Sequence, residues 1–220
     1  LCLDNNKKKI NNLKKGIIPI HENNLDKLVN SNLKGKRLRF STSSKEAINF
    51  SNIIFIAVDT PQKKNGEADL TAIKNVCKEI AKYLKPESII VEKSTVPVGT
   101  SDYIRKILKD NLPKSKKNMS FHIVSNPEFL KEGTAIDDFM KPDRIIIGLE
   151  DESLKNIFKT LYSPLDRKFN KIQFMDIKSS ELTKYASNAM LATKISFINE
   201  LANIANLLDV DIENVRKGMG

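Results

Sequence analysis

Short apolar stretches of strand length alternate with helical patterns along most of this chain. The strand-like stretches lie at residues 1–3, 38–40, 53–58, 89–91, 121–124, 145–147 and 172–174. Helical patterns fall between most of them, most clearly at residues 70–84, 102–109 and 154–162. Because the stretches 53–58 and 145–147 are continuously apolar, we expect both faces of the sheet to be covered. The alternation predicts an α/β fold with a doubly wound, mainly parallel sheet.

From Ser179 the pattern changes to one continuous helix of about 30 residues, which would be roughly 45 Å long. Ser179 or Ser180 is expected to cap this helix, which is apolar around most of its circumference and is therefore expected to be buried on several sides. A helix of this length suits a connection between domains or a subunit interface. We therefore expect one domain at residues 1–176 and the start of a second, helical domain at residues 177–220.

The charge and cysteine content exclude several classes of protein. The 220 residues carry a formal net charge of +10, but the lysines are spread out without interleaved aromatic residues, so nucleic-acid binding is not favoured. No stretch approaches the roughly 20 apolar residues that span a membrane, and no signal peptide is visible, so a cytoplasmic protein is expected. Cys2 and Cys77 have no metal-ligand spacing, and we interpret both as small core residues.

Polar residues gather directly after the predicted strands, where parallel α/β sheets bind their ligands. They are Asp4 and the segments 59–61, 93–97 and 126–128. Asp4 could accept hydrogen bonds from ribose hydroxyls or be an ordinary turn residue. The segment "STVPVGT" (94–100) could end in a helix N-terminus that Thr100 or Ser101 caps and that binds an anion, or be a plain strand-to-helix turn.

Lys184 and Asn188 are four residues apart, so they share a face of the long helix, which Leu191 and Ile195 continue. A cation and an N–H donor that point the same way suit a developing oxyanion. A solvated polar stripe is the alternative.

Two glutamates, Glu128 and Glu132, follow Asn126 and Pro127. Asn126 as N-cap, Pro127 in the first helical position and Glu128 in the first turn would make a favourable helix start. The same residues could also present two carboxylates at the carboxyl end of the sheet.

Three long motifs occur in one order along the chain: "EKSTVPVGT" (92–100), "SNPEFLKEGTAIDDFMKPDRIIIG" (125–148) and "SSELTKYASNAMLATKISFINE" (179–200). With weaker support at residues 14–28 and 59–61, the chain resembles the UDP-glucose/GDP-mannose dehydrogenases over essentially its whole length. The stretch "KEGTAI" is more similar to the UDP-glucose branch. The resemblance implies a Rossmann-like NAD-binding domain, the start of an all-α central domain, and a homodimer through residues 180–207.

The activity that the resemblance implies is a four-electron oxidation of UDP-glucose to UDP-glucuronate, a precursor for polysaccharide biosynthesis. The alcohol at C6 passes one hydride to NAD⁺, a cysteine adds to the aldehyde, a second hydride transfer leaves a thioester, and water releases the product. Lys184 and Asn188 would stabilise the oxyanion-like centres, Glu128 would handle protons during hydrolysis, and Thr95 would help to hold water.

The resemblance also implies two sets of binding residues. The cofactor set is Asp4, Lys9, Val58, Asp59, Thr60, Pro61, Gln62, Ser94, Thr95, Val96 and Glu132. The substrate set is Glu128, Phe129, Leu130, Lys131, Glu132, Lys184, Tyr185, Ala186, Ser187 and Asn188.

The chain also departs from the family pattern. The Gly-rich turn of the family is expected before Leu1, and its nucleophilic cysteine and UDP-binding domain after Gly220, so these residues alone are expected to be inactive. "HENNL" (21–25) stands where "YEPGL" is usual, and Asp59 where Pro or Asn is common. The alternatives are a dehydrogenase for GDP-mannose or another nucleotide sugar, a single-hydride β-hydroxyacid-type dehydrogenase, and a non-enzymatic nucleotide-sugar-binding module.

Overall fold

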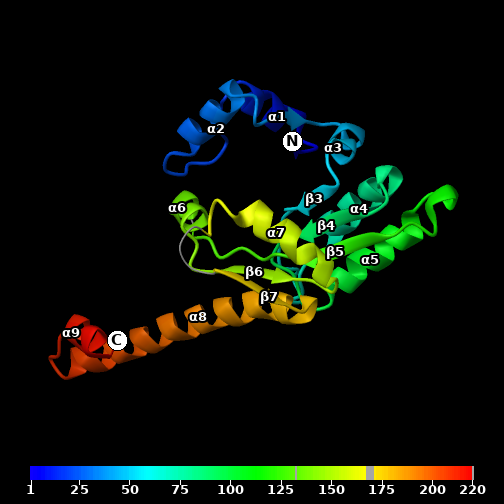
Figure 1. Ribbon diagram of the computed structural model, residues 1–220. Helices are drawn as coiled ribbons and strands as arrows, with labels where there is room; N and C mark the ends of the chain where they lie inside the picture. Colours follow the sequence, from blue (N-terminus) through cyan, green and yellow to red (C-terminus); the bar gives the residue numbers. More distant parts are fainter. Residues whose placement is uncertain (132, 167–170, 220) are drawn as a thin grey trace.

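The structure is a computed structural model that describes residues 1–131, 133–166 and 171–219. Figure 1 shows a small N-terminal lobe, a central sheet flanked by helices, and a long helix that leads away from the sheet. The lobe is built from β1 (Cys2–Leu3), α1 (Lys7–Lys14), α2 (Leu25–Lys34), β2 (Phe40–Ser41) and α3 (Ser44–Phe50). Its two strands pair in parallel and form a sheet of their own.

The central sheet has five strands in sequence order. They are β3 (Ile53–Ile56), β4 (Ser88–Glu92), β5 (Phe121–Ser125), β6 (Ile145–Gly148) and β7 (Ile172–Met175). Neighbouring strands are parallel except β5 and β6, which pair antiparallel. The prediction of a mainly parallel α/β sheet is therefore confirmed.

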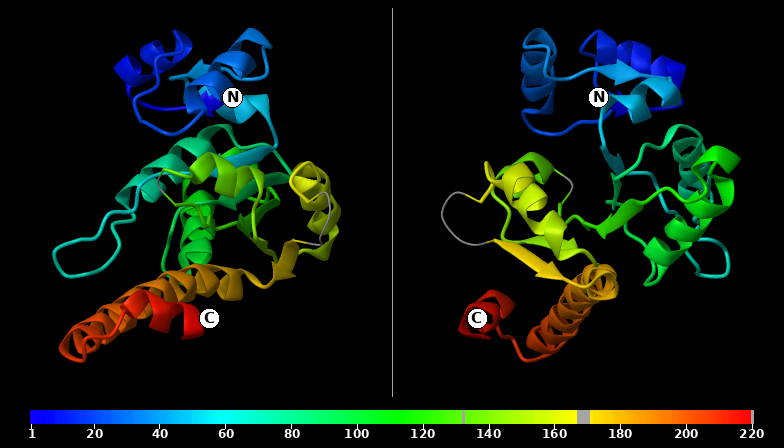
Figure 2. Two further views of the ribbon diagram at one scale, coloured as in Figure 1. Left: turned by 90° about the vertical axis from the view of Figure 1, so that its left-hand side faces the viewer. Right: turned by 45° about the vertical axis from the view of Figure 1, so that its right-hand side comes forward.

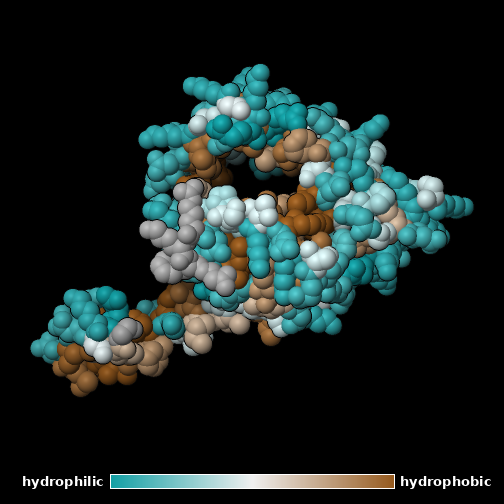
Figure 3. Space-filling model, in the orientation of Figure 1, coloured by the Kyte–Doolittle hydropathy of each residue, from teal (hydrophilic) through white to brown (hydrophobic). Residues whose placement is uncertain are grey.

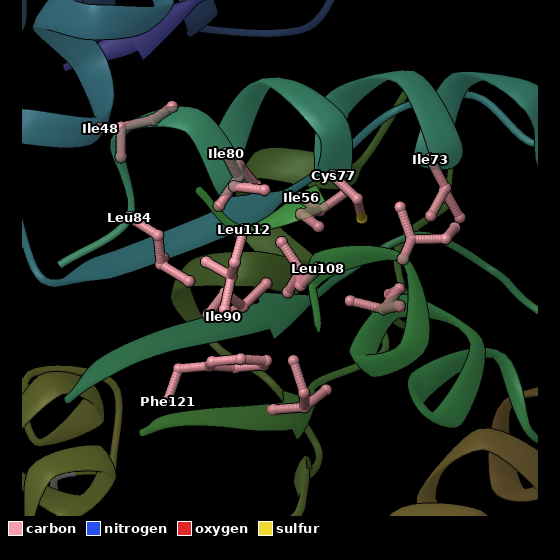
Figure 4. Packing of buried hydrophobic residues seen from close by; sticks show 14 of the residues in the cluster. Ile48, Ile56, Ile73, Cys77, Ile80, Leu84, Ile90, Leu108, Leu112 and Phe121 are labelled. Atoms are coloured by element: carbon pink, nitrogen blue, oxygen red, sulfur yellow. The ribbon is translucent and has the colours of Figure 1, made fainter. Parts of the chain in front are cut away.

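Alternate residues of β4 enter two different cores, because successive side chains of a strand point to opposite faces. Ile90 packs on one face beneath α4 (Thr71–Tyr83) and α5 (Thr100–Asn111), and Figure 4 shows this cluster. Ile89 and Val91 pack on the other face with α7 (Lys155–Tyr162). Both faces are covered, as a doubly wound sheet requires.

The two cysteines differ in burial. Cys77 lies in the cluster of Figure 4, where burial raises the pKa of its thiol to about 12. Cys2 is exposed, so its assignment to the core was wrong. The first strand of the lobe is only two residues long, which leaves its side chains near solvent.

Four short elements complete the fold. They are the 3₁₀ helices η1 (Lys114–Lys116) and η2 (Glu152–Leu154) and the helices α6 (Ala135–Met140) and α9 (Ile212–Met219). None of the helices in the described ranges has the length and apolar character that crossing a lipid bilayer needs.

The long helix α8 (Ile177–Leu207) begins earlier than the sequence predicts. Asp176, rather than Ser179 or Ser180, is its N-cap, because the Asp176 carboxylate accepts a hydrogen bond from the N–H of Ser179. The helix crosses β6 at Gly148, where an added Cβ would lie 2.5 Å from Cβ of Ser180 and 2.9 Å from Cα of Ile177. A residue without a side chain is therefore needed at position 148 for this close approach.

The prediction that α8 is buried on several sides is wrong for this chain. Only the first two turns pack closely against the sheet, and the rest of the helix runs out into solvent (Figures 1 and 2). Met190, Leu191, Ile195 and Phe197 are each more than half exposed, at 58%, 55%, 55% and 53%. Apolar surface is visible along this arm in Figure 3. The apolar pattern of α8 therefore marks a surface that nothing in the described part of the chain covers.

Candidate active site

A pocket opens at the carboxyl end of β5, between the loop that follows this strand, α6, and the start of β6. Its walls come from four segments, at residue 93 and at residues 126–131, 138–145 and 162–165. The lining residues are Lys93, Asn126, Pro127, Glu128, Phe129, Leu130, Lys131, Asp138, Phe139, Lys141, Pro142, Asp143, Arg144, Ile145, Tyr162 and Leu165. Of the predicted substrate-binding segment 128–132, residues 128–131 line this pocket.

The helix expected to start at Asn126 does not form. The backbone from Asn126 to Lys131 is irregular, and α6 begins only at Ala135. Tertiary hydrogen bonds occupy the amide that would have capped a helix: Asn126 Nδ2 donates to the carbonyl oxygen of Ile146 at 2.9 Å, and the Tyr162 hydroxyl donates to Oδ1. Asn126 thereby ties the loop after β5 to β6 and α7, and Glu128 lies on this irregular segment, where it lines the pocket.

Three charged side chains act on one another here: Lys93 and Glu128 line the pocket, and Lys184 on α8 is not among its lining residues. Lys93 is partly buried, and its Nζ donates to the carbonyl oxygen of Asn126 at 3.1 Å. Burial lowers the pKa of Lys93, and the Glu128 carboxylate opposes that effect. Burial also lowers the pKa of Lys184, which is only 8% exposed, and Glu128 again opposes it. Glu128 is thus the shared counter-charge of two ammonium groups held away from water.

An aromatic ring joins the loop to α8. The guanidinium of Arg144 lies 4.4 Å from the ring centroid of Phe129, and Nζ of Lys184 lies 5.3 Å from it. Arg144 also donates to Oγ of Ser187 on α8 at 3.3 Å. Cations on an aromatic face are stabilised by its negative potential, so Phe129 helps to fix both side chains. The Arg144 charge contributes to lowering the pKa of Lys184.

The N-terminal lobe places a paired acid where a cofactor ribose is expected. Lys9 Nζ lies 2.6 Å from Oδ2 of Asp4, and the backbone N–H of Asn6 donates to Oδ1 at 2.9 Å. The hydrogen bond from Lys9 lowers the pKa of Asp4, and the hydrogen bond from the Asn6 N–H lowers it further. An ionised acid directly after a strand fits a ribose diol, which it can accept hydrogen bonds from. Both residues of this expected pair are therefore together.

The loops after β3 and β4 are joined by hydrogen bonds. Ser94 Oγ accepts from the N–H of Val58 at 3.1 Å, and the Thr60 hydroxyl donates to the carbonyl oxygen of Thr95 at 2.7 Å. The exposed residues of the first loop are Asp59, Pro61 and Gln62. Val96, in contrast, is 3% exposed in the core, so it supports the loop from beneath.

The N-terminus of α5 already holds an anion from within the chain. The carboxylate of Glu181 on α8 accepts from the N–H groups of Gly99 at 2.6 Å and Ser101 at 2.8 Å. The hydroxyl of Thr100 donates to the carbonyl oxygen of Pro97 instead of capping the helix. Of the two alternatives for this segment, the one in which Thr100 or Ser101 caps the helix and leaves a free anion site is wrong, because the Glu181 carboxylate fills that position.

The remaining predicted site residues lie around the pocket or away from it. Tyr185, Ala186 and Asn188 are exposed on α8, and none of them lines the pocket. Asn188 therefore shares a helix with Lys184 without sharing its buried setting. Glu132 lies outside the described residues.

Sequence reasoning assigned no role to Lys93, Arg144 and Tyr162, although all three line the pocket. A signal existed for Lys93, because it directly follows β4 at the ligand-binding edge of the sheet. Nothing local marks Arg144 or Tyr162. Among the described residues, no group of three or more His, Cys, Asp and Glu side chains could hold a metal ion.

Comparison with known proteins gives a consistent answer for both parts of the chain. Residues 1–166 match the NAD-binding domain of the UDP-glucose/GDP-mannose dehydrogenase family, and residues 178–220 match its central domain. The UDP-glucose 6-dehydrogenase of Pseudomonas aeruginosa is 40% identical over 219 residues, and one from Bacillus subtilis is 46% identical over 219 residues. In both cases the match covers 100% of this chain and 48% of the relative.

Solved structures agree with the sequence relatives. A UDP-glucose dehydrogenase from Pyrobaculum islandicum superposes with a TM-score of 0.91 at 35% identity, over 99% of this chain and 50% of that one. A ternary complex of GDP-mannose dehydrogenase from Pseudomonas aeruginosa gives 0.89 at 33% identity, over 98% and 49%.

The chain spans about half the length of the curated relatives that it matches. The match to the NAD-binding domain extends from Asp4 in the lobe to Tyr162 at the pocket, so NAD is the cofactor for which this part of the chain is built. The match to the central domain begins at the first turn of α8, shortly before Lys184. The chain belongs to the UDP-glucose/GDP-mannose dehydrogenase family.

Proposed function

We propose that the whole protein oxidises UDP-glucose to UDP-glucuronate with NAD⁺ as the hydride acceptor, a transfer of four electrons. The observation that carries the proposal is that the Glu128 carboxylate, which lines the pocket, interacts electrostatically with the Lys184 ammonium group on α8. The two residues come from separate motifs, Glu128 from the segment after β5 and Lys184 from α8. A site that only bound a nucleotide sugar would have no need of a carboxylate that interacts with two partly buried ammonium groups.

Each side chain has a task in this proposal. When bound, NAD⁺ accepts the hydrides. Asp4 and Lys9 hold the adenosine ribose, and the joined loops at residues 58–62 and 94–96 border the cofactor. The Lys184 ammonium faces the oxygen on which negative charge develops. Glu128 takes up and returns protons, with Lys93 holding the backbone of its loop in place.

The choice of UDP-glucose rests on the relatives and on the "KEGTAI" stretch. Sequence relatives with 40% and 46% identity are UDP-glucose 6-dehydrogenases, whereas the GDP-mannose dehydrogenase structure is 33% identical. A thiol for covalent chemistry is not supplied by Cys77, which is buried in the core, nor by Cys2, which is in the lobe; neither lines the pocket.

The yield of NADH per sugar tests the proposal directly. The full-length protein, incubated with limiting UDP-glucose and excess NAD⁺, is expected to form about two NADH per UDP-glucose. The initial rate of NADH formation with GDP-mannose is expected to be less than a tenth of the initial rate with UDP-glucose. A yield of one NADH would point to a single-hydride dehydrogenase. Binding of UDP-glucose without any NADH would point to a binding module. Either result contradicts the proposal.

We further propose that residues 1–176 form the NAD-binding unit and that α8 starts the central domain, through which the protein forms a homodimer. The exposed apolar side chains of α8, residues 180–207, support this assignment, because a contiguous apolar patch of this kind is typical of an interface.

A charge placed on this surface is expected to break the dimer. Leu191→Glu in the full-length protein should change the mass measured by light scattering from that of a dimer to that of a monomer. Thr193→Glu places the same charge at an exposed polar position roughly 200° around the helix and serves as control. A Leu191→Glu protein that stays dimeric at micromolar concentration would rule out α8 as the interface.

A further inference from the structure

We propose that Glu22 is a positioning residue: from the N-terminal lobe it fixes the α6 wall of the substrate pocket. This inference rests on the proposed function for its kinetic consequence but not for its structural one. Glu22 lies in "HENNL", a segment to which the sequence assigned no role. It is more than 100 residues away in sequence from the segment that it contacts.

The Glu22 carboxylate bridges two backbone groups at the start of α6. Its Oε2 accepts from the N–H of Gly133 at 3.0 Å, and its Oε1 accepts from the N–H of Ala135 at 2.9 Å. The neighbouring Asn23 amide donates to the carbonyl oxygen of Gly133 at 3.5 Å. Both carboxylate oxygens are therefore used, and the two chain segments are held at a fixed distance.

The start of α6 depends on this distant carboxylate because it has no cap of its own. The N-cap residue, Thr134, makes no side-chain cap hydrogen bond. Its hydroxyl donates to Oδ2 of Asp138 at 3.2 Å, and the same oxygen accepts from the N–H of Lys131 at 2.9 Å. The first N–H groups of a helix lack partners within the helix, so Glu22 supplies what the local sequence does not.

This contact links the wall of the substrate pocket to the lobe that carries the proposed cofactor ligand. Lys131, Asp138 and Phe139, on or next to α6, line the substrate pocket. The lobe that carries Glu22 also carries Asp4, the proposed ribose ligand. Figure 3 shows an opening between the lobe and the central sheet. The Glu22 hydrogen bonds link the lobe to the segment that starts α6. The chain connection from β2 through α3 to β3 also joins the lobe to the sheet, so Glu22 supplies a second link, one that reaches the pocket wall.

Backbone amide exchange in the full-length protein tests the contact without requiring activity. Glu22→Gln keeps the size of the side chain but can accept only one of the two hydrogen bonds, and Glu22→Ala accepts neither. We expect the amides of residues 133–136 to exchange roughly 3- to 10-fold faster in Glu22→Gln, the loss of about one hydrogen bond, and faster still in Glu22→Ala. Asp26→Asn, on the exposed surface of α2 in the same lobe, removes the same charge and should leave these amides unchanged.

The kinetic readout separates a positioning role from a merely structural one. Glu22→Gln is expected to raise KM for UDP-glucose about 5-fold, with kcat changed less than 2-fold and the thermal midpoint of unfolding unchanged. Glu22→Ala should raise KM further. Unchanged amide exchange would overturn the contact itself. Faster exchange with an unchanged KM would show that Glu22 holds α6 without positioning substrate, which also overturns the inference. A wild-type protein that oxidises no nucleotide sugar would instead contradict the proposed function, while the exchange experiment would still decide whether Glu22 holds α6.

Discussion

Replacing Lys184 with methionine in the full-length protein is expected to lower kcat by about 100- to 1,000-fold, the usual cost of removing one donor that stabilises an oxyanion. Lys184 as a residue is 8% exposed, its Nζ lies 5.3 Å from the ring centroid of Phe129, and its charge interacts with that of Glu128. Interactions between charges are stronger where water is excluded, so a positive charge at this point acts strongly on a charge that develops beside it. Methionine keeps the length and apolar stem of the side chain but removes the charge.

Lys194→Met is the matched control for this experiment, because Lys194 is an exposed residue of the same helix. Steady-state rates with saturating UDP-glucose and NAD⁺ give kcat for both variants. We expect Lys194→Met to stay within a factor of two of the wild type. A kcat for Lys184→Met within about threefold of the wild type would show that this ammonium group does not act on the transition state.

Glu92→Gln is expected to change the pH dependence of stability by about 1.4 kcal/mol per pH unit between pH 5 and pH 8. Glu92 ends β4 with its side chain 1% exposed, and its Oε1 has no hydrogen-bond partner among the described residues. Burial raises the pKa of Glu92 from 4.5 to about 8, against hydrogen bonding from Ser94 that lowers it, and the neighbouring Glu181 raises it further. The folded protein therefore holds a proton on Glu92 that the unfolded chain releases above its ordinary pKa.

The sign of the effect follows from this proton. Below pH 4.5 the group is protonated in both states, and its contribution to stability is fully present. Between pH 4.5 and about 8 the folded state binds the extra proton, so the free energy of unfolding falls as pH rises, and above pH 8 the loss is complete. Glutamine resembles the protonated acid and does not titrate. The free energy of unfolding of Glu92→Gln relative to the wild type should therefore rise by about 3 kcal/mol from pH 5 to pH 7.

Urea unfolding at pH 5, 6, 7 and 8 measures the difference between the two proteins, in which all other titrating groups cancel. Glu200→Gln, at an exposed position on α8, is the control and should follow the wild type at every pH. A difference between Glu92→Gln and wild type that is constant from pH 5 to pH 8 would mean that Glu92 is already ionised in the folded protein.

The helix start proposed at Asn126 shows why some local predictions fail. An N-cap contributes about 1 kcal/mol, and a tertiary hydrogen bond about the same, so neither dominates by its own strength. Asn126 lies where both Tyr162 and the carbonyl oxygen of Ile146 can use its amide, and those two contacts replace the cap. The partners are 36 and 20 residues away, beyond the reach of any local pattern.

The start of α5 shows the same competition. Thr100 and Ser101 are both good local caps, yet Glu181, about 80 residues further along the chain, takes the N–H groups of Gly99 and Ser101. A carboxylate bonded to two N–H groups at the positive end of a helix dipole is stronger than a single hydroxyl cap. The prediction that α8 is buried was wrong for a different reason. An apolar circumference predicts that something covers the helix, and it does not say whether the cover comes from the same chain.

What the sequence determined by itself is the alternation of strands and helices, the burial of both sheet faces, and the edge at which polar loops meet. These properties follow from periodic patterns of apolar residues, and hydrophobic burial is strong enough to impose such patterns on the fold. The tertiary structure alone decided which partner each polar group took. Glu181 binds the start of α5 and Glu22 binds the start of α6, while the charges of Lys93 and Lys184 interact with that of Glu128. Hydrogen bonds and ion pairs at short range depend on distances of a few ångströms between segments that only the packed sheet brings together.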